Sequence, residues 1–237
     1  MVSVVFKAFR AIDDPEACVR FIEGHRKVLE IYGITMITSN KALWINHKNT
    51  YVILVESKED GRAVGGARVQ IADDELLLPM EDAVGVVDKN VFKFVKGYKE
   101  FPTAELCGLW NSREIAGYGI GSFFLIRAAI ALAGGQLKVK TLLALCAPAT
   151  VKMCSKAGFA IEKSLGNDGF FNYPKLDLVA TAMIIKDINN LEDATEDNRS
   201  FIETLLQNPQ LQKIEKGVKG EIVVEYDMLL NNQSANT

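Results

Sequence analysis

The chain has 237 residues, of which 49% are hydrophobic and 24% are charged, and these values are ordinary for a soluble globular protein. Its net charge of -3 and its pI near 5.6 argue against a nucleic-acid-binding protein, because such domains usually carry a basic surplus. No stretch is long and apolar enough to span a membrane, and residues 1–10 lack the apolar core of a signal peptide. We therefore expect a cytoplasmic protein with one large domain.

The number and spacing of the cysteine and histidine residues argue against a metal site. None of the four cysteines is in C-x-x-C spacing with another, and His25 and His47 are the only histidines. Cys107 and Cys146 lie in apolar, strand-like runs, which is typical of buried core residues. We expect no metal and no disulfide framework.

The first half of the chain predicts a helix followed by a β-hairpin. Asp14 and Pro15 are typical of a helix start, and the helical pattern ends at Gly33. Residues 51–57 and 62–71 are expected to be two strands joined by the turn at 58–61. The pair Gly65-Gly66 in the second strand indicates a bulge or a close approach of another group.

The second half of the chain alternates between predicted helices and predicted strands. We expect helices at 88–99, 118–133 and 148–158, and strands at 103–110, 138–146, 159–164 and 176–185. This order predicts a mixed α+β or α/β fold, with helices on both faces of a central sheet.

The composition of the sequence changes near residue 190. Residues 191–207 are acidic and helix-like, residues 221–230 form a short apolar segment, and residues 231–237 have the composition of a disordered tail. We therefore expect a domain at 1–189 and, at 190–237, a C-terminal helical extension with a flexible tail.

The segment Ala116-Gly117-Tyr118-Gly119-Ile120-Gly121-Ser122 lies between an apolar strand pattern and an apolar helix pattern. Its glycines allow the backbone to approach a ligand closely, and a helix N-terminus favours an anion such as phosphate. A tight turn without a ligand is the alternative. A dinucleotide site is disfavoured, because G-x-G-x-x-G counted from Gly117 would need glycine at position 122.

The glycine segment resembles the pyrophosphate-binding loop of the GCN5-related N-acetyltransferase (GNAT) superfamily, whose pattern is R/Q-x-x-G-x-G/A. Gly119 and Gly121 match the pattern glycines, and Cys154-Ser155-Lys156-Ala157-Gly158-Phe159 is similar to the family's Y-E-K-x-G-F segment. The expected element order also matches over residues 1–187. The resemblance implies a GNAT fold that takes acetyl-CoA or another acyl-CoA as co-substrate.

Two positions depart from the family pattern. Ala116 stands where the loop has Arg or Gln, and Cys154 stands where the family places a tyrosine that acts as general acid. Backbone N–H groups can bind pyrophosphate whatever the side chains are. A thiol at Cys154 could protonate the leaving thiolate, and a packed helix residue is the alternative.

The resemblance also implies the remaining site residues. A backbone N–H near Leu109 or Trp110, where the strand should bulge, would stabilise the oxyanion, and residues 116–122 would hold the CoA. Glu105 is the only carboxylate of the strand at 103–110 and is the candidate base. The alternative is a solvent-exposed glutamate at the start of a strand.

A narrower resemblance is to acyl-homoserine-lactone synthases and related long-chain N-acyl synthases. It depends on the segments 65–69 and 78–80 and on Glu105, whereas Cys107-Gly108-Leu109 departs from the Ser-Arg-Phe expected there. It implies a long acyl chain on acyl carrier protein, which Arg62, Arg68 and the basic face of 89–99 would meet.

We therefore expect an N-acyltransferase that moves an acyl group, with acetyl as the first choice, from acyl-CoA to a primary amine. The alternatives are a long-chain N-acyl synthase and a non-catalytic CoA-binding or regulatory module. A homodimer through the late strands or the tail is left open.

Overall fold

The computed structural model describes residues 1–34, 42–98 and 101–230. The strands are β1 (Ser3–Arg10), β2 (Thr50–Ser57), β3 (Ala63–Ile71), β4 (Thr103–Asn111), β5 (Thr141–Cys146), β6 (Ala160–Ile161), β7 (Phe170–Asn172), β8 (Val179–Ile185), β9 (Gln210–Gly217) and β10 (Gly220–Asp227). The helices are α1 (Pro15–Ile31), α2 (Pro79–Val84), α3 (Asn90–Gly97), α4 (Leu125–Gly135), α5 (Pro148–Lys156) and α6 (Glu196–Gln207). In this part of the chain no helix is long and apolar enough to cross a bilayer.

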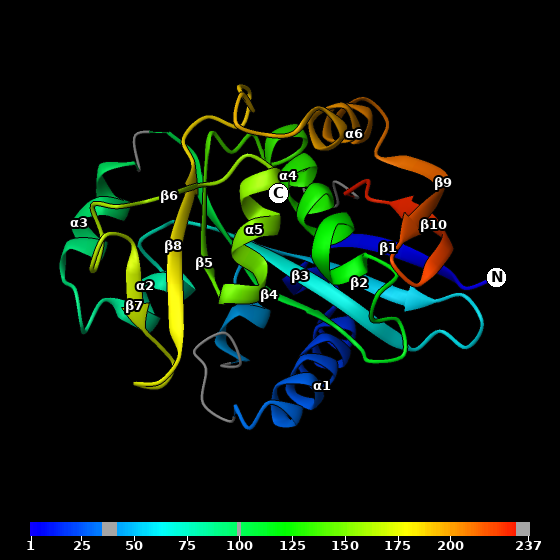
Figure 1. The fold of residues 1–237 in the computed structure, drawn as a ribbon, viewed down its shortest axis with the longest axis horizontal. Helices are drawn as coiled ribbons and strands as arrows, with labels where there is room; N and C mark the ends of the chain where they lie inside the picture. Colours follow the sequence, from blue (N-terminus) through cyan, green and yellow to red (C-terminus); the bar gives the residue numbers. More distant parts are fainter. Residues whose placement is uncertain (35–41, 99–100, 231–237) are drawn as a thin grey trace, which may run out of the picture.

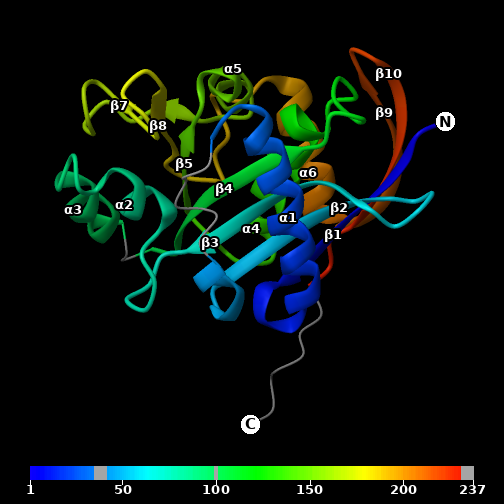
Figure 2. The same cartoon turned by 90° about the horizontal axis from the view of Figure 1, so that it is seen from below.

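The strands form one mixed sheet with the order β6-β8-β5-β4-β3-β2-β1-β10-β9, and β7 also pairs with β8 (Figure 1). The β4–β5 and β1–β10 pairs are parallel, whereas the other neighbours are antiparallel. Helices cover both faces of the sheet, as the sequence predicts. Figure 2 shows α1 on the face opposite α4.

Alternation along β2 shows how the two faces are filled. Val52 and Leu54 pack with Phe21 of α1, whereas Ile53 and Val55 belong to the core beneath α4. The start of α1 follows the expected capping, since the Ala17 N–H donates to the Asp14 carboxylate at 2.9 Å.

The helix expected from Tyr118 onwards begins differently. A π-helical turn covers Ile120–Phe124, and the regular helix α4 begins only at Leu125. The cause is local: Gly119 has φ +95°, and its carbonyl accepts from the N–H groups of both Phe123 and Phe124. The glycine segment therefore leads into a widened first turn.

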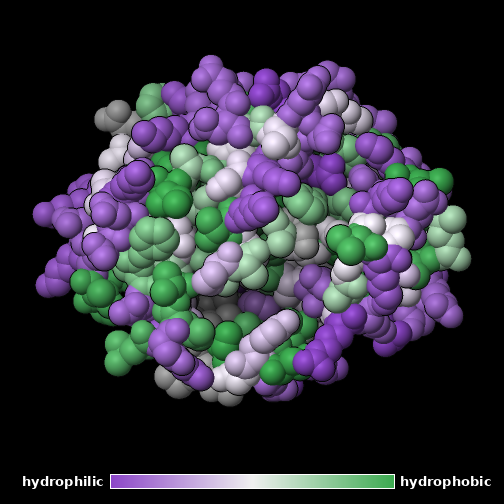
Figure 3. All heavy atoms as spheres, in the orientation of Figure 1, coloured by the Kyte–Doolittle hydropathy of each residue, from purple (hydrophilic) through white to green (hydrophobic). Residues whose placement is uncertain are grey.

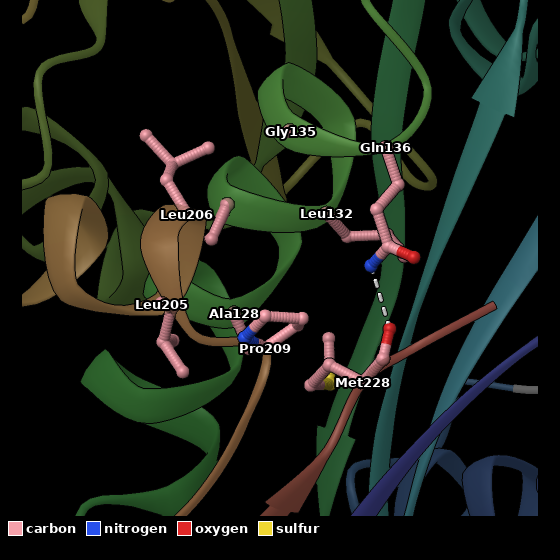
Figure 4. Close-up of a pocket in the computed structure, with 9 residues that line it drawn as sticks. Ala128, Leu132, Gly135, Gln136, Leu205, Leu206, Pro209 and Met228 are labelled. Atoms are coloured by element: carbon pink, nitrogen blue, oxygen red, sulfur yellow. Dashed lines mark hydrogen bonds between the residues drawn. The ribbon is translucent and has the colours of Figure 1, made fainter.

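The C-terminal residues continue the sheet. β10 runs parallel to β1, and β9 closes the edge as the antiparallel partner of β10. Gln136 after α4 holds the chain beyond β10. Its side-chain amide donates to the Met228 carbonyl at 2.7 Å (Figure 4), and its side-chain oxygen accepts from the Leu230 N–H at 2.8 Å. The boundary near residue 190 stays a prediction, and the expected tail at 231–237 lies outside the described residues.

Candidate active site

A cavity opens where β4 and β5 separate. The two parallel strands pair from Thr103↔Thr141 to Leu106↔Ala144, and no pairing is recorded beyond that point. The cavity has a volume of about 290 Å³, and Figure 3 shows the surface hollowed near the lower end of α5. Its lining includes Glu105, Cys107, Gly108, Leu109, Cys146 and Cys154. Two predicted site residues, Glu105 and Cys154, therefore lie in one cleft although 49 positions separate them in sequence.

Glu105 is buried at the base of this cleft with 1% of its surface exposed. Its carboxylate accepts a hydrogen bond from the backbone N–H of Met80 at 2.7 Å. Burial raises the pKa of Glu105 from 4.5 to about 8, and this hydrogen bond and the positive charge of Arg68 oppose the rise. The alternative of a solvent-exposed Glu105 is therefore wrong. A carboxylate with its pKa raised in this way can act as a general base near neutral pH.

Strand β4 bulges where the family resemblance implies it. Gly66 of β3 pairs with Trp110 of β4, and Arg68 of β3 pairs with Cys107 of β4. Between these two pairs β3 advances by two residues, whereas β4 advances by three. The extra residue of β4 falls at Gly108-Leu109, and Gly108 has φ +59°, which favours glycine. The bulge lies on the wall of the cleft, and the use of the Leu109 or Trp110 N–H as an oxyanion donor stays a prediction.

Cys154 enters the cleft from α5, on the other side of the sheet from Glu105. Its thiol sulfur lies 3.4 Å from the sulfur of Cys146, and both residues are buried. The hydrogen bond with Cys146 and burial raise the pKa of Cys154 well above its ordinary value. Cys154 is therefore a thiol that stays protonated at neutral pH, and its role as proton donor stays a prediction.

The glycine segment forms a compact loop at the start of α4. Gly117 and Gly119 have φ of +88° and +95°, which only glycine adopts without strain. Ile120 anchors the loop in the core, and a Cβ on Gly121 would lie 2.0 Å from the Asn111 side-chain oxygen. The N–H groups of Ile120 and Gly121 open the helical turn, so they have no acceptor earlier in the helix. They are available to an anion.

A buried polar cluster beside the cleft was not found from the sequence. The rings of His25, Trp44 and Trp110 surround Phe21 with centroids 5.8–6.1 Å from it, and the Arg68 guanidinium lies 4.5 Å from the Trp44 ring. Each of the four polar residues has one buried nitrogen without a hydrogen-bond partner in the described structure: His25 Nδ1, Trp44 Nε1, Arg68 Nη1 and Trp110 Nε1. Burial and the charge of Arg68 lower the pKa of His25 to about 4, so its imidazole is neutral at pH 7.

The position of Arg68 corrects one expectation. With 1% of its surface exposed, Arg68 cannot meet a carrier protein at the surface, because its side chain is covered by the aromatic cluster. An arginine in the middle of an apolar strand was the signal for a buried polar site.

No protein-family model matches the sequence, and no curated protein matches it either. Solved structures do. The fold is similar to that of FeeM, an N-acyl amino acid synthase from uncultured soil microbes, with TM-score 0.61 and 15% identity over 84% of this chain and 98% of that chain.

Two further structures support the same fold. The AHL synthase LasI has TM-score 0.51 and 18% identity over 80% of this chain and 92% of its own. An acyl-CoA N-acyltransferase from Pseudomonas aeruginosa has TM-score 0.50 and 10% identity, covering 76% and 97% of the two chains. The ten-stranded mixed sheet, its β4–β5 separation and these matches show that the chain has the fold of the GNAT-type N-acyltransferases.

Proposed function

We propose that this protein is an N-acyltransferase that moves an acyl group from acyl-CoA to a primary amine by direct transfer in the cleft between β4 and β5. The observation that carries the proposal is Glu105, a buried carboxylate with a pKa raised to about 8 in a cleft that also contains the β4 bulge. Strongly shifted pKa values cluster at functional sites, and a pKa near neutral pH suits a carboxylate that accepts a proton from an amine.

The donor would lie across the glycine loop and the bulge. In the proposal, the backbone of residues 116–122 binds the CoA pyrophosphate, and Leu109 and Trp110 bind the arm that leads to the thioester. Acetyl-CoA is the first donor to test. Fold similarity to the known enzymes does not by itself give the reaction, so the proposal depends on the site residues.

The reaction follows from these positions. Ionised Glu105 removes a proton from the acceptor amine, directly or through a water, and the amine nitrogen forms a bond to the thioester carbonyl carbon. The negative charge on the carbonyl oxygen is stabilised by a backbone N–H at the bulge. The carbon–sulfur bond then breaks, and the CoA thiolate takes up a proton, for which the Cys154 thiol is the candidate donor.

A second candidate function is a long-chain N-acyl synthase that uses acyl carrier protein and an acceptor bearing a carboxylate. The specific observation in its favour is that Arg68 Nη1 and the two indole N–H groups beside the cleft have no hydrogen-bond partner among the described residues. Buried donors of this kind favour an anionic ligand. FeeM, the N-acyl amino acid synthase, shares the fold. Amino acids should then be better acceptors than amines of equal size without a carboxylate.

The test is a thiol-release assay with acetyl-CoA, longer acyl-CoAs and acyl carrier protein across both acceptor classes. We expect Glu105→Gln to lower turnover about 100-fold or more, since general base catalysis contributes roughly 10² to 10⁴, while CoA affinity changes less than threefold. Glu114→Gln, which removes an exposed carboxylate, is the matched control. Unchanged turnover in Glu105→Gln would remove Glu105 from the mechanism. CoA binding without acylation of any amine would favour the non-catalytic module.

A further inference from the structure

The turn between β9 and β10 lies directly against the glycine loop. The backbone N–H of Lys219 donates to the Gly117 carbonyl at 2.9 Å. A Cβ placed on Gly217 would lie 2.3 Å from the carbonyl carbon of Tyr118, so at this point the two backbones are in contact. Residues about 100 positions apart thus form one surface.

Lys219 also brings a positive charge to this surface. Its ammonium group donates to the backbone carbonyl of Glu114 at 3.2 Å and lies 5.1 Å from the centre of the Tyr118 ring. Both partners belong to the glycine loop or to its approach. The carbonyl is a neutral acceptor, and the lysine is exposed to solvent, so the ammonium can exchange this partner for a stronger one.

The hairpin that carries Lys219 is held in place by buried contacts. Glu215 of β9 lies 3.8 Å from Arg127 of α4 and accepts a hydrogen bond from the Tyr226 hydroxyl at 3.3 Å. All three side chains are buried. Because α4 follows the glycine loop directly, these buried contacts fix the hairpin, and with it the exposed turn that carries Lys219, relative to the loop.

We propose that Lys219 supplies the cation for the phosphate groups of CoA that the glycine loop lacks in its own sequence. This inference rests on the proposed use of CoA. Ala116 stands where the related loops carry Arg or Gln, so residues 116–122 offer backbone N–H groups without a cationic side chain. When CoA binds, the Lys219 ammonium leaves the Glu114 carbonyl and donates to a phosphate oxygen, forming a charge-assisted hydrogen bond. The C-terminal hairpin is then part of the donor site.

The test compares calorimetric titrations of the full chain with CoA and with pantetheine, which has no phosphate. Lys219→Met keeps the backbone N–H that bonds to Gly117 and removes only the ammonium. We expect it to weaken CoA binding about tenfold, equal to about 1.4 kcal/mol, and to leave pantetheine binding unchanged. The salt dependence of CoA binding should also decrease. Lys219→Arg should retain most of the affinity.

Lys216→Met is the matched control, because it removes the same charge from another exposed position of the same hairpin. Its CoA affinity should stay within twofold of the parent value. Equal CoA binding by the parent and Lys219→Met would overturn the inference and leave the proposed function intact, as would an equal loss of pantetheine binding. Failure of the parent chain itself to bind CoA would instead refute the proposed donor.

Discussion

Arg127 of α4 and Glu215 of β9 form a buried ion pair, with the guanidinium nitrogen 3.8 Å from the carboxylate oxygen. The aromatic rings of Phe124 and Phe201 flank the guanidinium, with centroids 5.0 and 4.4 Å from its carbon. The pair joins the helix that follows the glycine loop to the C-terminal hairpin. Together with the direct contact of Lys219 with Gly117, it is a contact through which the last strands of the chain can affect the candidate donor site.

Removing only Arg127 should be costly. Arg127→Met leaves the Glu215 carboxylate buried without its counter-charge, and we expect a loss of about 3 kcal/mol in the free energy of unfolding, measured in urea. The double variant Arg127→Met/Glu215→Gln removes both charges and should recover a large part of this loss. A double variant no more stable than Arg127→Met would show that the ion pair contributes little.

Stability should depend on pH through Glu105. Its pKa is about 8 in the folded chain and about 4.5 when exposed, so the folded state binds the proton more tightly. This contribution to stability is fully present below pH 4.5 and is lost as the pH rises through 8, and the total is on the order of 4–5 kcal/mol. Glu105→Gln cannot ionise, and its unfolding free energy should vary less between pH 5 and 9. An identical pH dependence in the two proteins would contradict the raised pKa.

Activity should follow the same ionisation in the opposite direction. Only ionised Glu105 can accept a proton, so we expect kcat/KM to rise with pH with a midpoint near 8. Arg68 stabilises the ionised form, whereas Glu81 opposes it, and the neighbouring Cys107 thiol has a pKa raised to about 11 by burial. Arg68→Met should therefore shift the midpoint to higher pH by about one unit. Arg62→Met, which changes an exposed arginine, should not move it.

Cys154 should matter less to turnover than Glu105. A thiol whose pKa is raised well above its usual value is a weak acid, so its proton helps the leaving thiolate little. We expect Cys154→Ala to retain turnover within about tenfold of the parent, in the same thiol-release assay. Cys146→Ala, which changes the partner thiol, is the control. A loss as large as that of Glu105→Gln would instead support Cys154 as an important proton donor.

Gly66 should be intolerant of any side chain. A Cβ there would lie 2.7 Å from the Phe21 ring and 2.9 Å from the Ile53 carbonyl oxygen, so Gly66→Ala should lower the free energy of unfolding by about 1–3 kcal/mol. No described residue lies within 4 Å of a Cβ placed on Gly97 of α3, and Gly97→Ala should stabilise the chain by about 0.4–1 kcal/mol. Thermal unfolding of the two variants gives the comparison, and equal effects would argue against close packing at Gly66.

Local patterns along the chain predict the parts of the fold that depend on neighbouring residues. Asp14 and Pro15 predict the start of α1, glycine and charged residues predict the β2–β3 turn, and the apolar run at 103–110 predicts β4. Local signals suffice there because capping and turn formation involve residues only a few positions apart. The bulge of β4 is implied by the family resemblance and not by a local pattern, and in the structure Gly108 adopts there a conformation that favours glycine.

The sequence predicts β9 poorly. Its side chains are mostly polar and exposed, so no apolar alternation marks the strand, and its pairing with β10 defines it. The expected helix from Tyr118 starts late for a local reason that apolar spacing does not reveal, namely the φ of Gly119 and the double use of its carbonyl.

Only the tertiary structure decided which side chains share a site. The burial of Glu105 depends on the Met80 backbone from α2, and the cluster around Phe21 depends on the packing of α1 against β3 and β4. The Lys219 contact depends on a hairpin about 100 residues beyond the loop. Burial and charge set the pKa of a carboxylate, and both are sums over neighbours that are distant in sequence. The residue types were therefore readable from the chain, whereas their protonation and their partners follow from the packing of the sheet.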